Sequence, residues 1–131
     1  GSDSVTRESV DAAYRLGKLA AQAGEAAEAR QALTQAAEQA DDESLADLRT
    51  RSYLALAGVA EQEGRDEEAL RMLLSVALLY DDPELTPEAL YRAAAQLQRL
   101  GRNAEREQTL QELKQRYPGS PWAAKDDVAP R

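Results

Sequence analysis

The 131-residue sequence contains no cysteine and no histidine. Without cysteine there is no disulfide, no thiol nucleophile and no thiolate ligand for a metal. Without histidine the chain also lacks the side chain that most often acts as a general base, a metal ligand or a pH switch. Its glycines stand singly, so there is no glycine-rich loop to hold a phosphate. These absences argue against an enzyme, and we predict no cofactor and no metal site.

Basic residues and long apolar runs are also scarce. The chain has 16 Lys and Arg against 24 Asp and Glu, a net charge of −8, which is unlike the basic surface of a nucleic-acid-binding protein. No apolar run approaches the roughly 20 residues of a membrane-spanning helix. Acidic groups such as Asp41-Asp42 lack the alternation of a calcium loop and suit the caps of helices. We therefore expect no nucleic acid among the partners and no insertion into a membrane.

What the chain does contain favours helix. Alanine, leucine, glutamate, glutamine and arginine dominate, whereas phenylalanine is absent. Around Gly64, apolar residues recur at helical spacing on both sides, at Tyr53, Leu56, Ala57 and Ala60 and again at Ala69, Leu73, Val76 and Ala77. Glycine commonly closes a helix because it adopts the left-handed conformation without strain. This stretch therefore predicts two helices that fold back on each other.

The same pattern occurs three times. GEAAEARQAL begins at Gly24, GRDEEALRML at Gly64 and GRNAEREQTL at Gly101, so that successive glycines are 40 and then 37 residues apart. Pro87 and Pro121 each follow a hydroxyl residue, lie 34 residues apart and predict equivalent helix starts. We predict helices over residues 5–23, 26–40, 45–63, 66–80, 87–100 and 103–116, followed by a short C-terminal helical stub over residues 121–127.

The repeats resemble the tetratricopeptide repeat (TPR) family, whose period is about 34 residues. The matching residues are Leu16-Gly17, Gly24, Ala29, Leu33 and Ala36, then Tyr53, Leu56, Ala57, Gly64, Ala69, Leu73 and Val76, and finally Ala94, Gly101, Leu110, Leu113 and Pro118. No tryptophan opens a unit, and Arg106 stands where the family has a small alanine. The resemblance implies an all-α, right-handed solenoid of three tandem antiparallel helix hairpins, with repeats at about residues 10–43, 50–83 and 87–120.

In TPR proteins the first helix of each pair lines a concave groove for a protein segment. On the corresponding face the sequence places a set of polar, aromatic and apolar residues at helical spacing: Tyr14, Lys18, Gln22, Arg51, Leu54, Glu61, Gln62, Tyr91, Gln98 and Arg99. We predict that Tyr14, Leu54 and Tyr91 form an apolar track and that the chain is a non-enzymatic scaffold for a protein or peptide partner. The alternative is that the tyrosines pack between repeats. Some TPR domains clamp a terminal carboxylate with lysine, asparagine and arginine, but no asparagine lies on this face.

Two longer stretches, LLYDDPELTPEALYRAAAQLQRLG and LKQRYPGSPWA, resemble TPR proteins of the bacterial envelope. These include the periplasmic partner of the Tol–Pal system and lipoproteins of outer-membrane assembly. The resemblance implies a periplasmic or envelope location, with the cytoplasm as the alternative, and a fragment of a larger protein. Gly1-Ser2 is interpreted as a tag remnant, residues 3–127 as one domain and residues 128–131 as a frayed tail.

The alternative function is a structural spacer or self-assembly module within a longer repeat array. Residues 1–84 carry 8 basic and 18 acidic side chains, whereas residues 85–131 carry 8 basic and 6 acidic ones. Ends of unlike charge permit head-to-tail contact between copies. We nevertheless expect a monomer, because Trp122 can fold back over the C-terminal end of the array.

Overall fold

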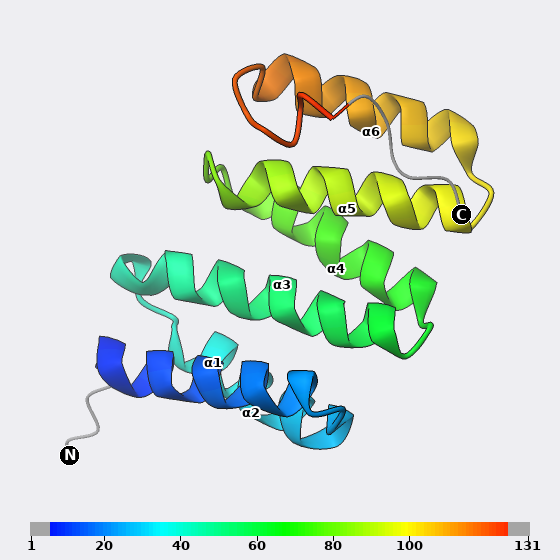
Figure 1. Cartoon of the computed structure of the whole chain (residues 1–131). Helices are drawn as coiled ribbons and strands as arrows, with labels where there is room; N and C mark the ends of the chain where they lie inside the picture. Colours follow the sequence, from blue (N-terminus) through cyan, green and yellow to red (C-terminus); the bar gives the residue numbers. More distant parts are fainter. Residues whose placement is uncertain (1–5, 126–131) are drawn as a thin grey trace.

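The computed structural model describes residues 6–125 and shows three antiparallel helix hairpins stacked in one array (Figure 1). The hairpins are α1 (Arg7–Gln22) with α2 (Ala26–Gln39), α3 (Ala46–Gln62) with α4 (Asp66–Leu79), and α5 (Leu85–Arg99) with α6 (Asn103–Arg116). A 3-10 turn, η1 (Glu43–Leu45), precedes α3. Residues 6–125 contain no strand. The predicted all-α array of three helix hairpins is confirmed.

Each hairpin turns at a glycine in the left-handed region. The φ angles are 79° at Gly24, 74° at Gly64 and 76° at Gly101. At the first turn the Gly24 N–H donates to the carbonyl oxygen of Ala21 at 3.1 Å, and the next N–H donates to that of Ala20 at 2.8 Å. These bonds satisfy carbonyl groups that the end of the helix leaves free. The predicted glycine turns are therefore present in all three hairpins.

The core lies at the contacts between successive helices. Leu73 and Val76 of α4 pack in one cluster with Ala89, Ala93 and Leu97 of α5. All of these side chains are buried, and Leu73 is fully so. The alanines on α5 allow the two helices to approach closely, so that the leucines fill the remaining space. Stability thus comes from stacking one hairpin on the next.

Ion pairs also join neighbouring hairpins. Arg30 of α2 donates to Glu68 of α4 at 3.0 Å and to Glu63 at the end of α3. Arg7 of α1 pairs in the same way with Asp47 of α3. Each guanidinium favours the charged form of its partner, so the pKa of Glu68 and the pKa of Asp47 both fall below their usual range. These contacts help to fix the angle at which the second hairpin meets the first.

Two helix starts differ from the prediction by two residues, and α3 begins one residue later than predicted. α1 begins at Arg7 rather than at residue 5, because Thr6 and Ser9 form a reciprocal capping box. α5 begins at Leu85, two residues before the predicted start, because the Asp82 carboxylate accepts hydrogen bonds from the N–H groups of Glu84 and Leu85. Thr86 is the hydroxyl residue before the predicted start at Pro87, but its side chain is buried and donates to the carbonyl oxygen of Tyr80 at 2.8 Å.

The end of the described chain also differs from the prediction. Residues 121–124 form turns instead of the expected helical stub, although the Ala124 N–H donates to the carbonyl oxygen of Ser120 at 3.2 Å. The turns bring Trp122 against Tyr91, with ring centroids 5.2 Å apart, and bury Ala123 on α6. Trp122 thus folds back over the C-terminal hairpin, as the sequence suggested. The expected tag remnant and frayed tail lie outside the described residues.

Candidate protein-binding groove

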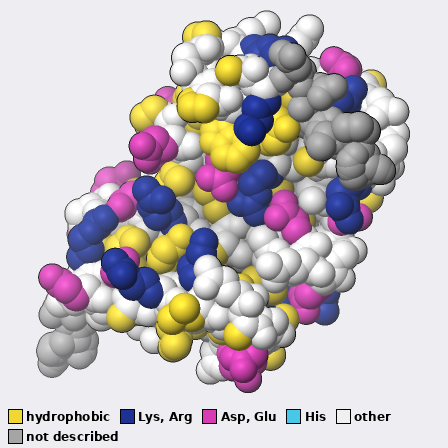
Figure 2. All heavy atoms as spheres, in the orientation of Figure 1, with side chains coloured by type: hydrophobic (Ala, Val, Ile, Leu, Met, Phe, Trp, Pro, Cys, Tyr) yellow, Lys and Arg dark blue, Asp and Glu magenta, His cyan; other side chains and the backbone are white. Residues whose placement is uncertain are grey.

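The first helices of the three hairpins border a pocket of about 300 Å³. α1 contacts α3, and α3 contacts α5, so these helices follow one another along the array (Figure 1). Figure 2 shows Lys and Arg side chains gathered over α1 and α3, with hydrophobic side chains between them. The pocket is lined by Tyr14, Lys18 and Ala21 of α1, by Arg51, Leu54, Ala55, Gly58, Val59 and Gln62 of α3, and by Leu85, Glu88 and Arg92 of α5.

The floor of the pocket belongs to α3. Leu54 is buried in the central core cluster, so packing holds the apolar surface that it contributes in a fixed position. Gly58 follows one turn later and carries no side chain. A Cβ at this position would lie 3.6 Å from Nη2 of Arg92, which is an ordinary contact distance. Glycine therefore keeps the floor open between Leu54 and the polar far wall.

The cations of the pocket differ in their availability. The Lys18 ammonium lies 5.8 Å from the ring centroid of Tyr14 and is otherwise exposed. Nη2 of Arg51 comes no closer than 3.9 Å to the Glu84 carboxylate, and both side chains are solvated, so this ion pair is weak. Lys18 and Arg51 are therefore the positive groups that a ligand can reach.

Arg92, the third cation of the pocket, is held by the protein itself. It is 19% exposed and donates to Glu61 at 2.9 Å and to Glu88 at 3.0 Å. It also donates to the carbonyl oxygen of Leu54 at 3.2 Å. Its charge is thus balanced within the wall of the pocket, where it positions α5 against α3.

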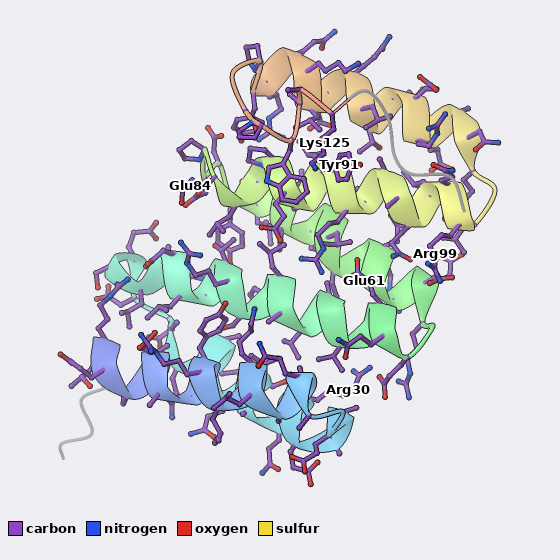
Figure 3. The ribbon with its side chains drawn as sticks, viewed as in Figure 1. Arg30, Glu61, Glu84, Tyr91, Arg99 and Lys125 are labelled. Atoms are coloured by element: carbon purple, nitrogen blue, oxygen red, sulfur yellow. The ribbon has the colours of Figure 1, made fainter. Side chains whose placement is uncertain are left out.

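The structure brings together half of the residues that the sequence placed on this face. Tyr14, Lys18, Arg51, Leu54 and Gln62 line the same pocket. The other five residues lie outside the lining of the pocket. Gln22 is exposed near the end of α1, Glu61 accepts hydrogen bonds from Arg92 and Gln96, and Tyr91 packs on Trp122. Gln98 has a buried side-chain oxygen, and Nε of Arg99 lies 3.5 Å from a carboxylate oxygen of Asp66. Figure 3 shows Tyr91 beside Lys125, well separated from Arg99 at the C-terminal end of α5. The apolar part of the pocket therefore involves Tyr14 and Leu54 without Tyr91.

Several lining residues were not singled out by sequence reasoning. Leu85 was expected in the loop before α5, and it enters the pocket because Asp82 starts the helix early. Ala55 and Val59 fall outside a single stripe at i, i+3 and i+4 spacing. α3 is buried on several sides because it packs on α2, α4 and α5. The available signal for this was that the polar residues of α3 do not gather on one face of the helix.

No group of three or more acidic side chains within residues 6–125 is arranged to hold a metal ion. Over the same residues, no helix is both long and apolar enough to cross a membrane. A tetratricopeptide repeat family model matches residues 11–42 and 88–120. These two matches cover most of the first and third hairpins.

The middle hairpin has the same glycine turn and stacks between the two matched repeats. The tetratricopeptide repeat family is a non-catalytic family whose members generally mediate protein–protein interactions. No curated protein and no solved structure matches the chain in these comparisons.

Proposed function

We propose that the pocket bordered by α1, α3 and α5 binds an extended segment of a partner protein that presents an acidic side chain next to an apolar one. The observation that carries the proposal is the placement of Lys18 and Arg51 beside Tyr14 and Leu54 in one pocket. The whole chain has a net charge of −8. A local pair of accessible cations on such a chain would attract an acidic segment and disfavour a basic one.

The geometry supports a division of labour within the pocket. Leu54 and the ring of Tyr14 supply the apolar contact, and Gly58 leaves room for a ligand side chain between them and Arg92. Lys18 and Arg51 lie on α1 and α3, so a carboxylate between them would be held from two helices. The apolar contact would supply affinity, and the cations would supply orientation and selectivity.

The proposal is tested with two fluorescein-labelled ten-residue peptides. In one, leucine alternates with aspartate, and in the other leucine alternates with lysine. We expect the aspartate peptide to bind and its affinity to fall as salt is raised, because Lys18 and Arg51 are solvated. The double substitution Lys18→Ala and Arg51→Ala should weaken binding by about tenfold or more.

Arg15→Ala with Arg71→Ala is the matched control. It also removes two exposed cations, but neither lies in the pocket, so binding should not change by more than about twofold. Equal binding of the aspartate and lysine peptides would refute the proposal. An affinity for the aspartate peptide that Lys18→Ala with Arg51→Ala leaves unchanged would also refute it.

An envelope location and membership of a larger protein stay predictions from the sequence. Fractionation of cells that express the parent gene tests the location. The alternative of a spacer or self-assembly module predicts no peptide binding but a molecular mass that rises with concentration. Light scattering across protein concentration and salt separates this alternative from the binding function.

A further inference from the structure

Two large apolar side chains are open to solvent at the α1 end of the array. Leu16 is 62% exposed and Leu19 is 63% exposed. With Ala23 and the start of α2 they border a shallow depression of about 580 Å³ whose rim includes Glu25 and Glu28. Hydrophobic side chains are visible along this lower end of the molecule in Figure 2. We call this surface, made by Leu16, Leu19, Ala23, Glu25 and Glu28, the end face.

The repeat shows what such a surface receives. When the hairpins are aligned at Gly24 and Gly64, Leu16 corresponds to Leu56 and Leu19 corresponds to Val59. In the second hairpin these side chains are only 5% and 2% exposed. They are buried because they pack in one cluster with Ala29 and Leu33 of the preceding helix, α2. Leu16 and Leu19 therefore occupy positions at which the next hairpin receives an amphipathic helix.

The charges follow the same alignment. Glu28 corresponds to Glu68, which accepts a 3.0 Å hydrogen bond from Arg30 of α2. Glu28 is exposed, and within residues 6–125 its carboxylate has no hydrogen-bond or ion-pair partner. Glu25 lies beside it and is likewise exposed. A helix that docked here as α2 docks on the second hairpin would bring its basic residue to Glu28.

Within residues 6–125, α6 at the C-terminal end of the array presents no exposed leucine that a second copy could place on the end face. Leu110 and Leu113 of α6 are already covered in a cluster with Ala123 and Trp122. Apart from Ala104, the exposed side chains of α6 are polar or charged, including Glu107, Gln111, Lys114 and Gln115. Head-to-tail stacking of two copies would therefore set a polar surface against Leu16 and Leu19, which costs desolvation without apolar burial. This argues against head-to-tail stacking of two copies through α6.

We propose that the end face binds an amphipathic helix of the α2 type from a partner, with an alanine and leucine stripe and an arginine or lysine placed to reach Glu28. Leu16 and Leu19 bury the stripe, and Glu28 accepts the basic side chain. This contact is separate from the pocket between α1, α3 and α5. It goes beyond the groove function and holds whether or not the groove binds a peptide.

The test uses a fluorescein-labelled peptide with the sequence of residues 25–40. A hydrocarbon staple between positions 31 and 35 holds it helical and replaces two side chains that are exposed in α2. Fluorescence anisotropy then measures its binding to the full chain. We expect saturable binding that Leu16→Glu weakens by about tenfold or more. Leu16 is exposed, so the variant should keep its melting temperature.

Charge exchange makes the test specific for the proposed pair. Arg30→Glu in the peptide should weaken binding, and Glu28→Arg in the protein should restore binding of that altered peptide by at least about fivefold. Leu78→Glu is the matched control, because Leu78 is 84% exposed but lies on α4, away from the end face. Lys18→Ala with Arg51→Ala should also leave this binding unchanged, which separates the end face from the groove.

Three results would overturn the proposal. The first is no saturable binding of the stapled peptide, and the second is binding that Leu16→Glu leaves unchanged. The third comes from sedimentation of the chain alone: a dimer that Leu16→Glu converts to a monomer would show that a second copy covers the end face. A monomeric chain whose peptide binding follows the charge exchange supports it.

Discussion

Arg92 of α5 and Glu61 of α3 form a hydrogen-bonded ion pair of 2.9 Å in the wall of the pocket. The same guanidinium reaches Glu88 at 3.0 Å and the carbonyl oxygen of Leu54 at 3.2 Å. Its side chain is 19% exposed and that of Glu61 is 27% exposed, so water screens the pair only in part. This arrangement fixes α5 to α3 and removes Arg92 from the cations that a ligand can use.

Replacing Arg92 with glutamine should lower the free energy of unfolding by about 1–2 kcal/mol, between the values for exposed and fully buried pairs. Urea unfolding measures the change. The loss should become smaller in the background Glu61→Gln, because the two side chains interact. Arg71→Gln is the control, since Arg71 is exposed and has no ion-pair partner within residues 6–125. Equal effects of Arg92→Gln and Arg71→Gln would contradict the structural role.

Two glycines inside helices should respond oppositely to alanine. A Cβ on Gly17 would lie 2.5 Å from Cγ of Leu33, which is fully buried and has no room to move. Gly17→Ala should therefore destabilise the protein by about 1–3 kcal/mol. At Gly58 the nearest atom is Nη2 of Arg92 at 3.6 Å, so Gly58→Ala should be neutral or stabilise by up to about 1 kcal/mol. The melting temperatures of the two variants test this prediction. A Gly17→Ala protein as stable as the parent would show that the Leu33 side chain can shift to accommodate the added Cβ.

Leu73 and Leu78 of α4 provide a matched pair for the core. Leu73 is fully buried between α4 and α5, whereas Leu78 is 84% exposed. Leu73→Ala should cost about 2–5 kcal/mol of unfolding free energy because it leaves a cavity. Leu78→Ala should stay within about 0.5 kcal/mol of the parent protein. Circular dichroism should remain helical in both, and a neutral Leu73→Ala would mean that the hairpins do not stack as described.

The repeats could be predicted because their signals are local. The turn at Gly64 can be predicted from the glycine itself, which adopts a positive φ, and from the apolar residues on both sides of it. The start of α5 could not be fixed in this way. Pro87 is acceptable within the first turn of a helix, so it allows more than one starting residue. The choice was made by the Asp82 carboxylate, whose two hydrogen bonds draw Leu85 into the helix.

The pocket was predictable only within single helices. Helical period places Tyr14 with Lys18, and Arg51 with Leu54, on common faces, and these four do line one pocket. The surroundings of Tyr91 depend on Trp122, which returns to it from beyond α6. Likewise, the sequence shows Arg92 as a cation but not that Glu61 from another hairpin balances it. Such contacts between distant segments follow from how the hairpins stack and turn.

Acid should weaken the contact between the first two hairpins. Arg30 donates to Glu68 and lowers the pKa of that carboxyl below its unfolded value. A lowered folded pKa gives stability that is fully present above the unfolded pKa of about 4.3 and is lost as the pH falls through the folded value.

The measurement for this contact is urea unfolding of Glu68→Gln at several pH values. The variant should be less stable than the parent by up to about 1 kcal/mol near pH 6, with the difference shrinking towards pH 3. Glu28→Gln occupies the matching position in the first hairpin and removes a carboxylate without an ion-pair partner in the described chain. Its effect on the free energy of unfolding at pH 6 should stay within about 0.5 kcal/mol. A Glu68→Gln difference that stays constant from pH 6 to pH 3 would rule out the linkage.

The single tryptophan of the chain reports directly on the C-terminal hairpin. Trp122 lies against Tyr91 with ring centroids 5.2 Å apart, and the Lys125 ammonium lies 5.2 Å from the Trp122 ring and 5.6 Å from that of Tyr91. Tyr91→Ala removes one side of this contact, so we expect the emission of Trp122 to shift to longer wavelength and the protein to lose about 1–2 kcal/mol of stability.

Tyr14→Ala is the control for the Tyr91 substitution, because Tyr14 lies on α1 and packs with residues of the first hairpins. Tyr14→Ala should leave the emission of Trp122 unchanged but weaken the binding of the aspartate peptide. The two tyrosines would then have different roles, one bordering the pocket and one holding the C-terminal turns in place. If Tyr91→Ala instead weakens the peptide and leaves both the emission and the melting temperature as they are, Tyr91 belongs to the binding surface, and the groove extends along α5.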